Sequence, residues 1–293
     1  MTERPLDPLT ETGLERRLGD WARRRLPYGL AEFVMFGLKQ GWACLFGGLL
    51  IVGIIGTRLV WQEGWSLARY DFLLFYALGL QAAFLWFRLE TWEEARVILL
   101  FHLTGTAMEW FKVHAGSWAY PEPALFKLFD VPLFSGFMYA SVGSYIARVI
   151  RVFDMTFAPY PPFWATALLA VAIYVNFFAH HYVPDIRWLL FAATALLFWR
   201  TRIYFTVGDR HWMPMLLASV LAAFFLWVAE NVGTLTGTWV YAGSATFDWA
   251  SISKMGSWYL LLYVAFVTVT VVVREPLRSG PGDKQTRPTR RRP

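Results

Sequence analysis

Two stretches of this chain carry the same spaced set of acidic, glycine and aromatic residues. The first contains Glu109, Gly116, Ser117, Trp118 and Tyr120, and 121 residues later the second contains Glu230, Gly237, Thr238, Trp239 and Tyr241. Both follow the pattern Glu-x6-Gly-[Ser/Thr]-Trp-x-Tyr, and each begins near the end of a long apolar run. A repeat at a fixed shift indicates two related structural units.

The two glutamates are the residues best suited to chemistry. An ionised carboxylate in hydrocarbon is costly, so such a group faces the interior of a helix bundle, where it is paired or protonated. If the repeat brings Glu109 and Glu230 together, their charges repel, and we expect one to be a neutral carboxylic acid able to donate a proton. A helix cap or an interhelical hydrogen bond is the structural alternative for either residue.

Other polar and aromatic residues fall near the glutamates. His102 lies two helical turns before Glu109, Asn176 and His180 share a helix face, and Asn231 follows Glu230. The predicted catalytic residues are therefore Glu109, Glu230, His102 and His180. The predicted substrate-binding residues are Trp110, Trp118, Tyr120, Asn176, Asn231, Trp239, Tyr241 and Trp258. Anchoring at the membrane interface is the alternative for the Trp and Tyr residues.

The sequence favours a site without metal or cofactor. His180, His181 and Asp185 are weak metal candidates, because neighbouring helical residues point apart and no second spaced pair is present. No nucleotide-binding motif of the GxGxxG or GxxxxGK[ST] type occurs. A single cysteine, Cys44, excludes an intramolecular disulfide.

The elements that position these residues must be membrane helices. Only 16% of the residues are charged, against about 25% in soluble domains. Eight apolar runs of suitable length occur, at about 40–58, 71–89, 95–114, 132–152, 162–182, 188–206, 213–233 and 254–273. We predict an all-α polytopic membrane protein with about eight transmembrane helices in two parallel four-helix repeats, at 33–153 and 154–275. Four spans per repeat is an even number, which makes the halves parallel.

The distribution of Lys and Arg predicts a bacterial inner-membrane protein with both termini in the cytoplasm. The inner side then holds both tails and Arg88, Arg96, Arg148, Arg151, Arg200, Arg202 and Arg210. The outer side holds Arg58, Arg69, Lys112, Lys127, Arg187 and Lys254.

The two tails are predicted to touch anionic lipid headgroups. Residues 1–32 form an amphipathic basic leader, for which a solvated charged segment is the alternative, and residues 276–293 form a disordered basic tail. Because most of the net charge of +6 lies in these tails, no basic groove for nucleic acid is expected.

Residues 30–275 resemble a bacterial membrane family of unknown function, through the segment from Phe177 to Arg187 and the two Glu-x6-Gly motifs. The motifs are also similar, more distantly, to integral-membrane carotenoid enzymes, the heterodimeric-type lycopene cyclases and the carotenoid hydratases. That resemblance implies that Glu109 and Glu230 match their membrane-embedded acids, and that Trp118, Tyr120, Trp239 and Tyr241 match their aromatic loop. The segment from His180 to Arg187 has no counterpart in those enzymes.

These observations predict cofactor-independent acid–base chemistry, a cyclisation or hydration, on an isoprenoid or other lipid within an outward-facing cavity. Protonation of a double bond needs an acid in a dry site and aromatic faces that stabilise the carbocation. A proton-coupled transporter is one alternative, because paired intramembrane carboxyls also serve proton relays. A metal-dependent protein that modifies or binds lipid is another.

Overall fold

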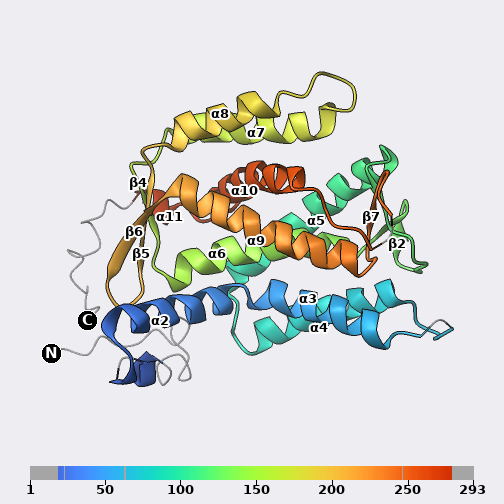
Figure 1. Cartoon of the computed structure of the whole chain (residues 1–293), viewed down its shortest axis with the longest axis horizontal. Coiled ribbons are helices and arrows are strands. Elements are labelled where there is room, and N and C mark those ends of the chain that lie inside the picture. The colour runs from blue at the N-terminus through green and yellow to red at the C-terminus, as the bar shows by residue number, and fades with distance from the viewer. Residues whose placement is uncertain (1–18, 23, 63, 246, 279–293) are drawn as a thin grey trace, which may run out of the picture.

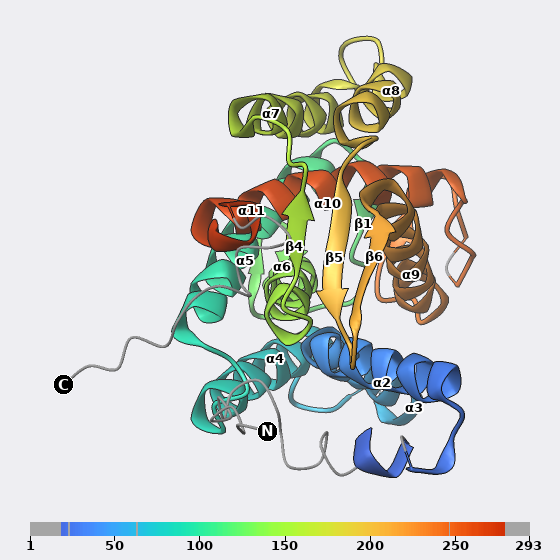
Figure 2. The ribbon, with the colours of Figure 1, turned by 90° about the vertical axis from the view of Figure 1, so that its left-hand side faces the viewer.

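The helices of the protein lie in three layers along its long axis (Figure 1, Figure 2). The computed structural model describes residues 19–22, 24–62, 64–245 and 247–278. One outer layer contains α2 (Tyr28–Ala43), α3 (Leu45–Val60) and α4 (Arg69–Trp86). The middle layer contains α5 (Trp92–His114), α6 (Ser135–Val152), α9 (Met215–Leu235) and α10 (Ser253–Val272). The other outer layer contains α7 (Phe163–Ala179) and α8 (Arg187–Phe198), and α11 (Glu275–Arg278) follows α10.

The mostly helical prediction is confirmed, and each predicted apolar run contains a helix. Pro162 and Pro214 occupy the N-cap positions of α7 and α9, where the missing proline N–H is harmless. Before α5, the Thr91 hydroxyl accepts a hydrogen bond from the Glu94 N–H at 3.2 Å. The Glu94 carboxylate accepts one in return from the Thr91 N–H at 2.9 Å, which completes a capping box.

The first predicted span is two helices rather than one. α2 and α3 meet at Cys44 with a bend of 68°. α2 begins at Tyr28, within the leader predicted for residues 1–32, and residues 1–18 of that leader lie outside the described part of the chain. Most of the predicted tail, residues 279–293, also lies outside it.

The sixth predicted span is wrong in its second half, because α8 ends at Phe198 and a strand follows. β4 (Thr156–Ala158), β5 (Arg202–Thr206) and β6 (Arg210–Pro214) form an antiparallel sheet in that order. Ile203 and Phe205 are buried, while Arg202 between the helix and these residues is exposed. This alternation and the Gly208-Asp209 turn are typical of a hairpin. The all-α prediction therefore holds only for the spanning part.

The predicted eight spans are not confirmed. Within the described residues, α9 and α10 are long and apolar enough to cross a membrane, and the bent pair α2–α3 would make a third span. α8 has 12 residues, so it is about 18 Å long against a hydrocarbon core of about 30 Å. The protein is a membrane protein, and the finer span count stays a prediction.

Two arginines of α6 form ion pairs with Glu90, just before α5, and with Glu94 of α5. Arg148 contacts Glu90 at 2.8 Å, and both side chains are fully buried. Arg151 contacts Glu94 at 2.8 Å. Ion pairing of this kind removes the charges from lipid.

The two ends of the bundle differ (Figure 1). One end, here called the sheet end, holds β4, β5, β6 and α11. The opposite end, here called the motif end, holds β1 (Trp118–Ala119), β7 (Val240–Tyr241) and the hairpin of β2 (Lys127–Leu128) and β3 (Val131–Pro132). Both copies of the repeated motif therefore lie at the same end of the protein.

Candidate functional site

Glu109 is buried, with 2% of its surface exposed, and accepts three hydrogen bonds from aromatic side chains. Its Oε2 atom accepts from Trp118 Nε1 at 2.7 Å and from the Tyr120 hydroxyl at 2.8 Å. Its Oε1 atom accepts from the Tyr139 hydroxyl at 2.5 Å. Tyr139 reaches α5 because Gly105 faces it, and a Cβ there would lie 2.7 Å from the Tyr139 side chain.

Glu230 is buried in the same way. Its Oε1 atom accepts hydrogen bonds from Trp239 Nε1 at 2.7 Å and from the Tyr241 hydroxyl at 2.6 Å. Its Oε2 atom accepts from Trp258 Nε1 at 3.2 Å. In each copy the glutamate is thus bound by the tryptophan nine residues later and the tyrosine eleven residues later.

The glycine explains the spacing of the motif. Gly116 has φ +69° and Gly237 has φ +65°, a region that favours glycine. Directly after them, the Ser117 N–H donates to the Lys112 carbonyl and the Thr238 N–H donates to the Gly233 carbonyl, both at 2.9 Å. These bonds end the helix in a Schellman motif. The chain then reverses and brings the tryptophan and tyrosine back to the glutamate one to two turns inside the helix.

The two motif copies pair with each other. β1 and β7 are antiparallel, with Trp118 opposite Tyr241 and Ala119 opposite Val240. Ala119 and Val240 are equivalent positions of the repeat, so the pairing is symmetric about them. The Trp118 and Tyr241 rings lie 5.9 Å apart between centroids. Donors to one glutamate therefore touch donors to the other.

Glu109 and Glu230 line one cavity and are close enough for their charges to interact. The sequence predicts that one of the two glutamates is a neutral acid, and this stays a prediction. Both oxygens of Glu230 accept an indole N–H, which fits an ionised carboxylate for this residue. An indole N–H can only donate, so Trp118, Trp239 and Trp258 each require an acceptor oxygen. A proton shared in this site fits best between Glu109 Oε1 and the Tyr139 hydroxyl, since both of these groups can donate.

The cavity has a volume of about 1300 Å³ and runs along the bundle. At the motif end its walls include both glutamates and their aromatic donors. Toward the sheet end it reaches Phe33, Gln40 and Phe205. Its middle section is lined by apolar residues, among them Leu50, Ile51, Val142, Ile146, Leu221 and Phe225. The cavity therefore extends well beyond the outward-facing site that the sequence predicts.

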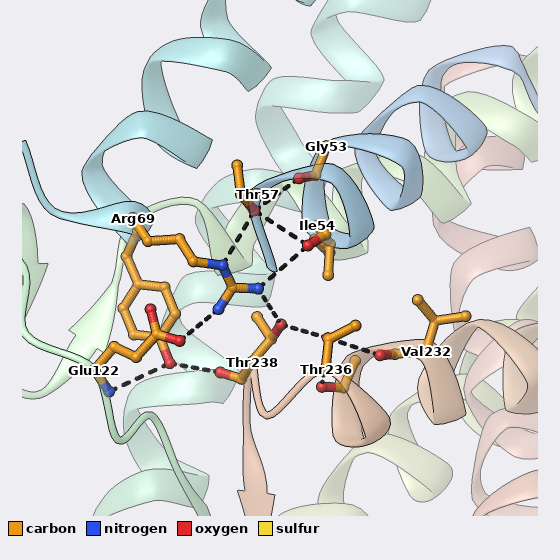
Figure 3. Close-up of polar contacts among 10 residues, drawn as sticks. Gly53, Ile54, Thr57, Arg69, Glu122, Val232, Thr236 and Thr238 are labelled. Carbon is orange, nitrogen blue, oxygen red and sulfur yellow. Dashed lines mark hydrogen bonds and ion pairs between the residues drawn. The ribbon is translucent and has the colours of Figure 1, made fainter. Parts of the chain in front are cut away.

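Arg69 fixes the turn of the second motif copy (Figure 3). Its guanidinium is buried and donates to Thr238 Oγ1 at 2.9 Å, Thr57 Oγ1 at 3.1 Å and the Ile54 carbonyl at 3.3 Å. It also forms an ion pair with Glu122 at 2.5 Å. α3 and α4 are thereby joined to the residue that precedes Trp239. This arginine was expected only as an outer-side charge.

Cationic and imidazole groups line the cavity beside the glutamates. Lys112 Nζ lies 3.0 Å from His181 Nε2, and the Ser117 hydroxyl lies 3.1 Å from the same nitrogen. Lysine can only donate, so this imidazole nitrogen accepts. Burial lowers the pKa of His181, and the neighbouring Lys112 charge lowers it further. Lys254 and Arg187 also line this part of the cavity.

Several predicted site residues do not line the cavity, and one of them binds the backbone of a loop instead. His102 packs against Phe137 of α6 with ring centroids 4.4 Å apart, and Trp110 is exposed beside Phe129. Asn231 accepts from the Ala250 N–H at 2.9 Å and donates to the Trp227 carbonyl. These three residues are absent from the cavity lining, as far as the described residues show. Trp118, Tyr120, Trp239, Tyr241 and Trp258 do line it.

The segment from Asn176 to Arg187 is held by its own polar contacts. Asn176 lines the cavity, donates to Asp185 at 3.0 Å and accepts from the Ile186 N–H. His180 lines the cavity and contacts the Asn176 carbonyl at 3.1 Å. Burial raises the pKa of Asp185, but hydrogen bonds from Asn176 and Arg187 outweigh it, and the net pKa is lowered. Among described residues, no group of three His, Cys, Asp or Glu side chains could hold a metal ion.

Sequence reasoning missed Tyr139, Arg69 and Lys112. Tyr139 has no matching tyrosine in the second repeat, because the position 121 residues later is Leu260. Lys112 stands within the first motif copy, but its equivalent in the second is Gly233. Lys112 could have been predicted as a site residue, because it is a cation on the predicted outer side and comes three residues after a glutamate that is expected to be buried.

Comparisons with known proteins give the family. Residues 32–266 match the family described as "Protein of unknown function (DUF817)". The "Uncharacterized protein YoaT" of Bacillus subtilis (strain 168) is 42% identical over 242 residues, which cover 82% of this chain and 91% of that protein.

Among solved structures, the mycobacterial Insig homolog MvINS from Mycobacterium vanbaalenii is similar with a TM-score of 0.44 and 16% identity, over 65% of this chain and 98% of that chain. A cross-linked variant trimer of MvINS gives a TM-score of 0.45 and 17% identity over the same shares. The sequence matches alone span most of the chain, and they show that this membrane protein belongs to the DUF817 family of proteins of unknown function.

Proposed function

We propose that this protein binds an isoprenoid or other long-chain lipid in its cavity and transfers protons to it at Glu109 and Glu230 without a cofactor. One observation carries the proposal: a long apolar cavity has two hydrogen-bonded carboxylates at one end. Its volume of about 1300 Å³ exceeds the range of about 300–1,000 Å³ common for small-molecule sites. An elongated apolar ligand matches this shape and lining.

A lipid would enter from the side, through the face that α2 and α3 turn to the cavity. Gly37, Gly41 and Gly48 line the cavity, and nothing lies within 4 Å of a Cβ at any of them. Because these glycines have no side chains, the cavity is wide enough there for the hydrocarbon chain of a lipid. Lateral entry suits a ligand that is itself dissolved in the bilayer.

The chemistry we propose is protonation of a double bond, because an apolar cavity here brings carboxyl groups together with aromatic rings. Glu109 in its neutral form, hydrogen-bonded to the Tyr139 hydroxyl, gives its proton to one alkene carbon and becomes a carboxylate, and the positive charge develops on the other carbon. Trp118 and Trp239 stand beside the site, and their π-faces stabilise such a cation. In a cyclisation Glu230 removes a proton to form a new double bond, and in a hydration water adds and loses a proton to Glu230.

Mass spectrometry of lipid bound to the detergent-purified protein tests the binding. We expect an isoprenoid or similar chain at near-stoichiometric amounts. Incubation of the protein with the extracted lipid then tests the reaction. Glu109→Gln and Glu230→Gln should each lower turnover by about 100-fold or more, because general acid–base groups contribute at least this much.

The matched control is Glu93→Gln, which changes an exposed glutamate at the sheet end of α5. It should leave both binding and turnover unchanged. Recovery of no lipid in near-stoichiometric amounts from the wild type contradicts the proposal. Full turnover by either site variant contradicts the assigned chemistry while leaving the binding function intact.

A proton-coupled carrier is the second candidate, because the cavity reaches from the motif end to residues at the sheet end. A carrier needs access from both faces, which the cavity length favours. Proteoliposomes loaded with a pH-sensitive dye discriminate the two functions. Lipid-dependent proton uptake that Glu109→Gln abolishes supports the carrier, and turnover without proton flux supports the enzyme.

A further inference from the structure

Three cations gather where the cavity meets the motif end, and we call Lys112, Arg187 and Lys254 the cation cluster. They come from the end of α5 and the beginnings of α8 and α10, and all three line the cavity. All three belong to the side of the membrane on which the sequence leaves few Lys and Arg. Lys and Arg are usually scarce on the outer side of a membrane protein, so three of them in one place indicate a specific role.

Lys112 is the most buried member, with 2% of its surface exposed. Its Nζ contacts His181 Nε2 at 3.0 Å and lies 4.1 Å from the centre of the Phe177 ring. Within the described residues no carboxylate lies within ion-pair distance of this ammonium group. A buried lysine is normally paired with an anion, so the site lacks a negative partner.

Lys254 and Arg187 add charge to the same place. Lys254 Nζ lies 3.7 Å from the centre of the Tyr241 ring. Glu230 is near enough to attract it, but the oxygens of Glu230 already accept three aromatic donors. Arg187 binds Asp185 through Nε at 2.5 Å. The three cations are close enough to repel one another.

We propose that the cation cluster binds the phosphate head group of a lipid whose chain lies in the cavity. Phosphate carries up to two charges and several acceptor oxygens, which suits two ammonium groups and a guanidinium better than a singly charged carboxylate does. The N-terminal ends of α8 and α10 add favourable dipoles. This inference rests on the proposed function, because the chain must occupy the apolar cavity.

The test compares three probes on the full-length protein in detergent: geranylgeranyl phosphate, the corresponding alcohol geranylgeraniol, and inorganic phosphate. Binding is measured by tryptophan fluorescence and by native mass spectrometry. We expect the lipid phosphate to bind at least tenfold more tightly than the alcohol, and inorganic phosphate to bind weakly. Lys112→Gln and Lys254→Gln should each weaken lipid phosphate binding about tenfold and leave alcohol binding unchanged.

Arg58→Gln is the matched control, because Arg58 is an exposed cation of the same side that does not line the cavity. It should bind all probes as the wild type does. Lys254→Gln keeps the test valid if the deeply buried Lys112 variant fails to fold.

Equal affinity for the lipid phosphate and the alcohol overturns the head-group inference but leaves the lipid cavity standing. Failure of both lipid probes to bind contradicts the proposed function as well. Inorganic phosphate that binds as tightly as the lipid phosphate overturns the lipid assignment and makes free phosphate the ligand of the cation cluster.

Discussion

Each buried glutamate of the site is stabilised chiefly by neutral aromatic donors. A carboxyl group in an apolar bundle needs hydrogen bonds that replace water, and three N–H or O–H groups supply them for Glu109 and for Glu230. Hydrogen bonds to a charged group are worth about 1.5–3 kcal/mol each. This arrangement leaves the nearby lysines available for another anion.

Removing one indole donor should therefore destabilise the protein, while phenylalanine keeps an aromatic ring at the site. Trp118→Phe and Trp239→Phe each leave a glutamate with two donors, and we expect each to lower the free energy of unfolding by about 1–3 kcal/mol. Thermal unfolding in detergent measures this loss as a lower Tm. The bond from the indole to the glutamate is 2.7 Å long in both copies, so both variants should lose it.

Trp110→Phe is the control for this pair, since Trp110 is exposed and makes no bond to either glutamate. Its Tm should match that of the wild type. A wild-type Tm for both site variants would mean that the indole bonds contribute nothing to stability and that the buried glutamates do not depend on these donors.

At the scale of elements, the glycine-lined face of α2 and α3 sets the width of the cavity. Gly48→Leu should fill the cavity without strain, because nothing lies within 4 Å of a Cβ at this position. Leucine also has a higher helix propensity than glycine. We expect unchanged or higher Tm together with at least tenfold weaker lipid binding, measured by lipid recovery after purification.

Gly56→Leu is the matched variant two helical turns later in α3. Its Cβ also meets nothing within 4 Å, but Gly56 does not line the cavity. It should keep full lipid binding. If both variants bind lipid equally well, the lipid does not occupy the section of the cavity beside α3.

The sequence allowed the helices and the motif residues to be predicted, because long apolar runs and a repeated spacing are local signals. The pairing of β1 with β7 was not predictable in detail, since two-residue strands carry no pattern of their own. Tyr139 and Arg69 could not be assigned because their roles depend on helices brought together by packing. The strand β5 was missed because its apolar residues continue the run that begins in α8.

At the scale of the whole molecule, the described chain begins and ends at the sheet end. α2 starts there, and α11 lies beside β4 (Figure 1, Figure 2). Arg202 and Arg210 lie in β5 and β6 at the sheet end, and Arg200 directly precedes β5, while the cation cluster is at the motif end. From the positive-inside rule we predict that the sheet end lies in the cytoplasm and the motif end outside.

This orientation is tested by cysteine labelling in intact cells. Cys44 is replaced by Ala, and single cysteines are introduced as Ser66→Cys, before α4 at the motif end, or Glu93→Cys, at the sheet end of α5; both positions are exposed. A membrane-impermeant maleimide should label Ser66→Cys in intact cells and Glu93→Cys only after permeabilisation. The reverse pattern would place the cation cluster in the cytoplasm, where cytoplasmic phosphates reach it. Labelling of both cysteines in intact cells would contradict the presence of a membrane between the two ends.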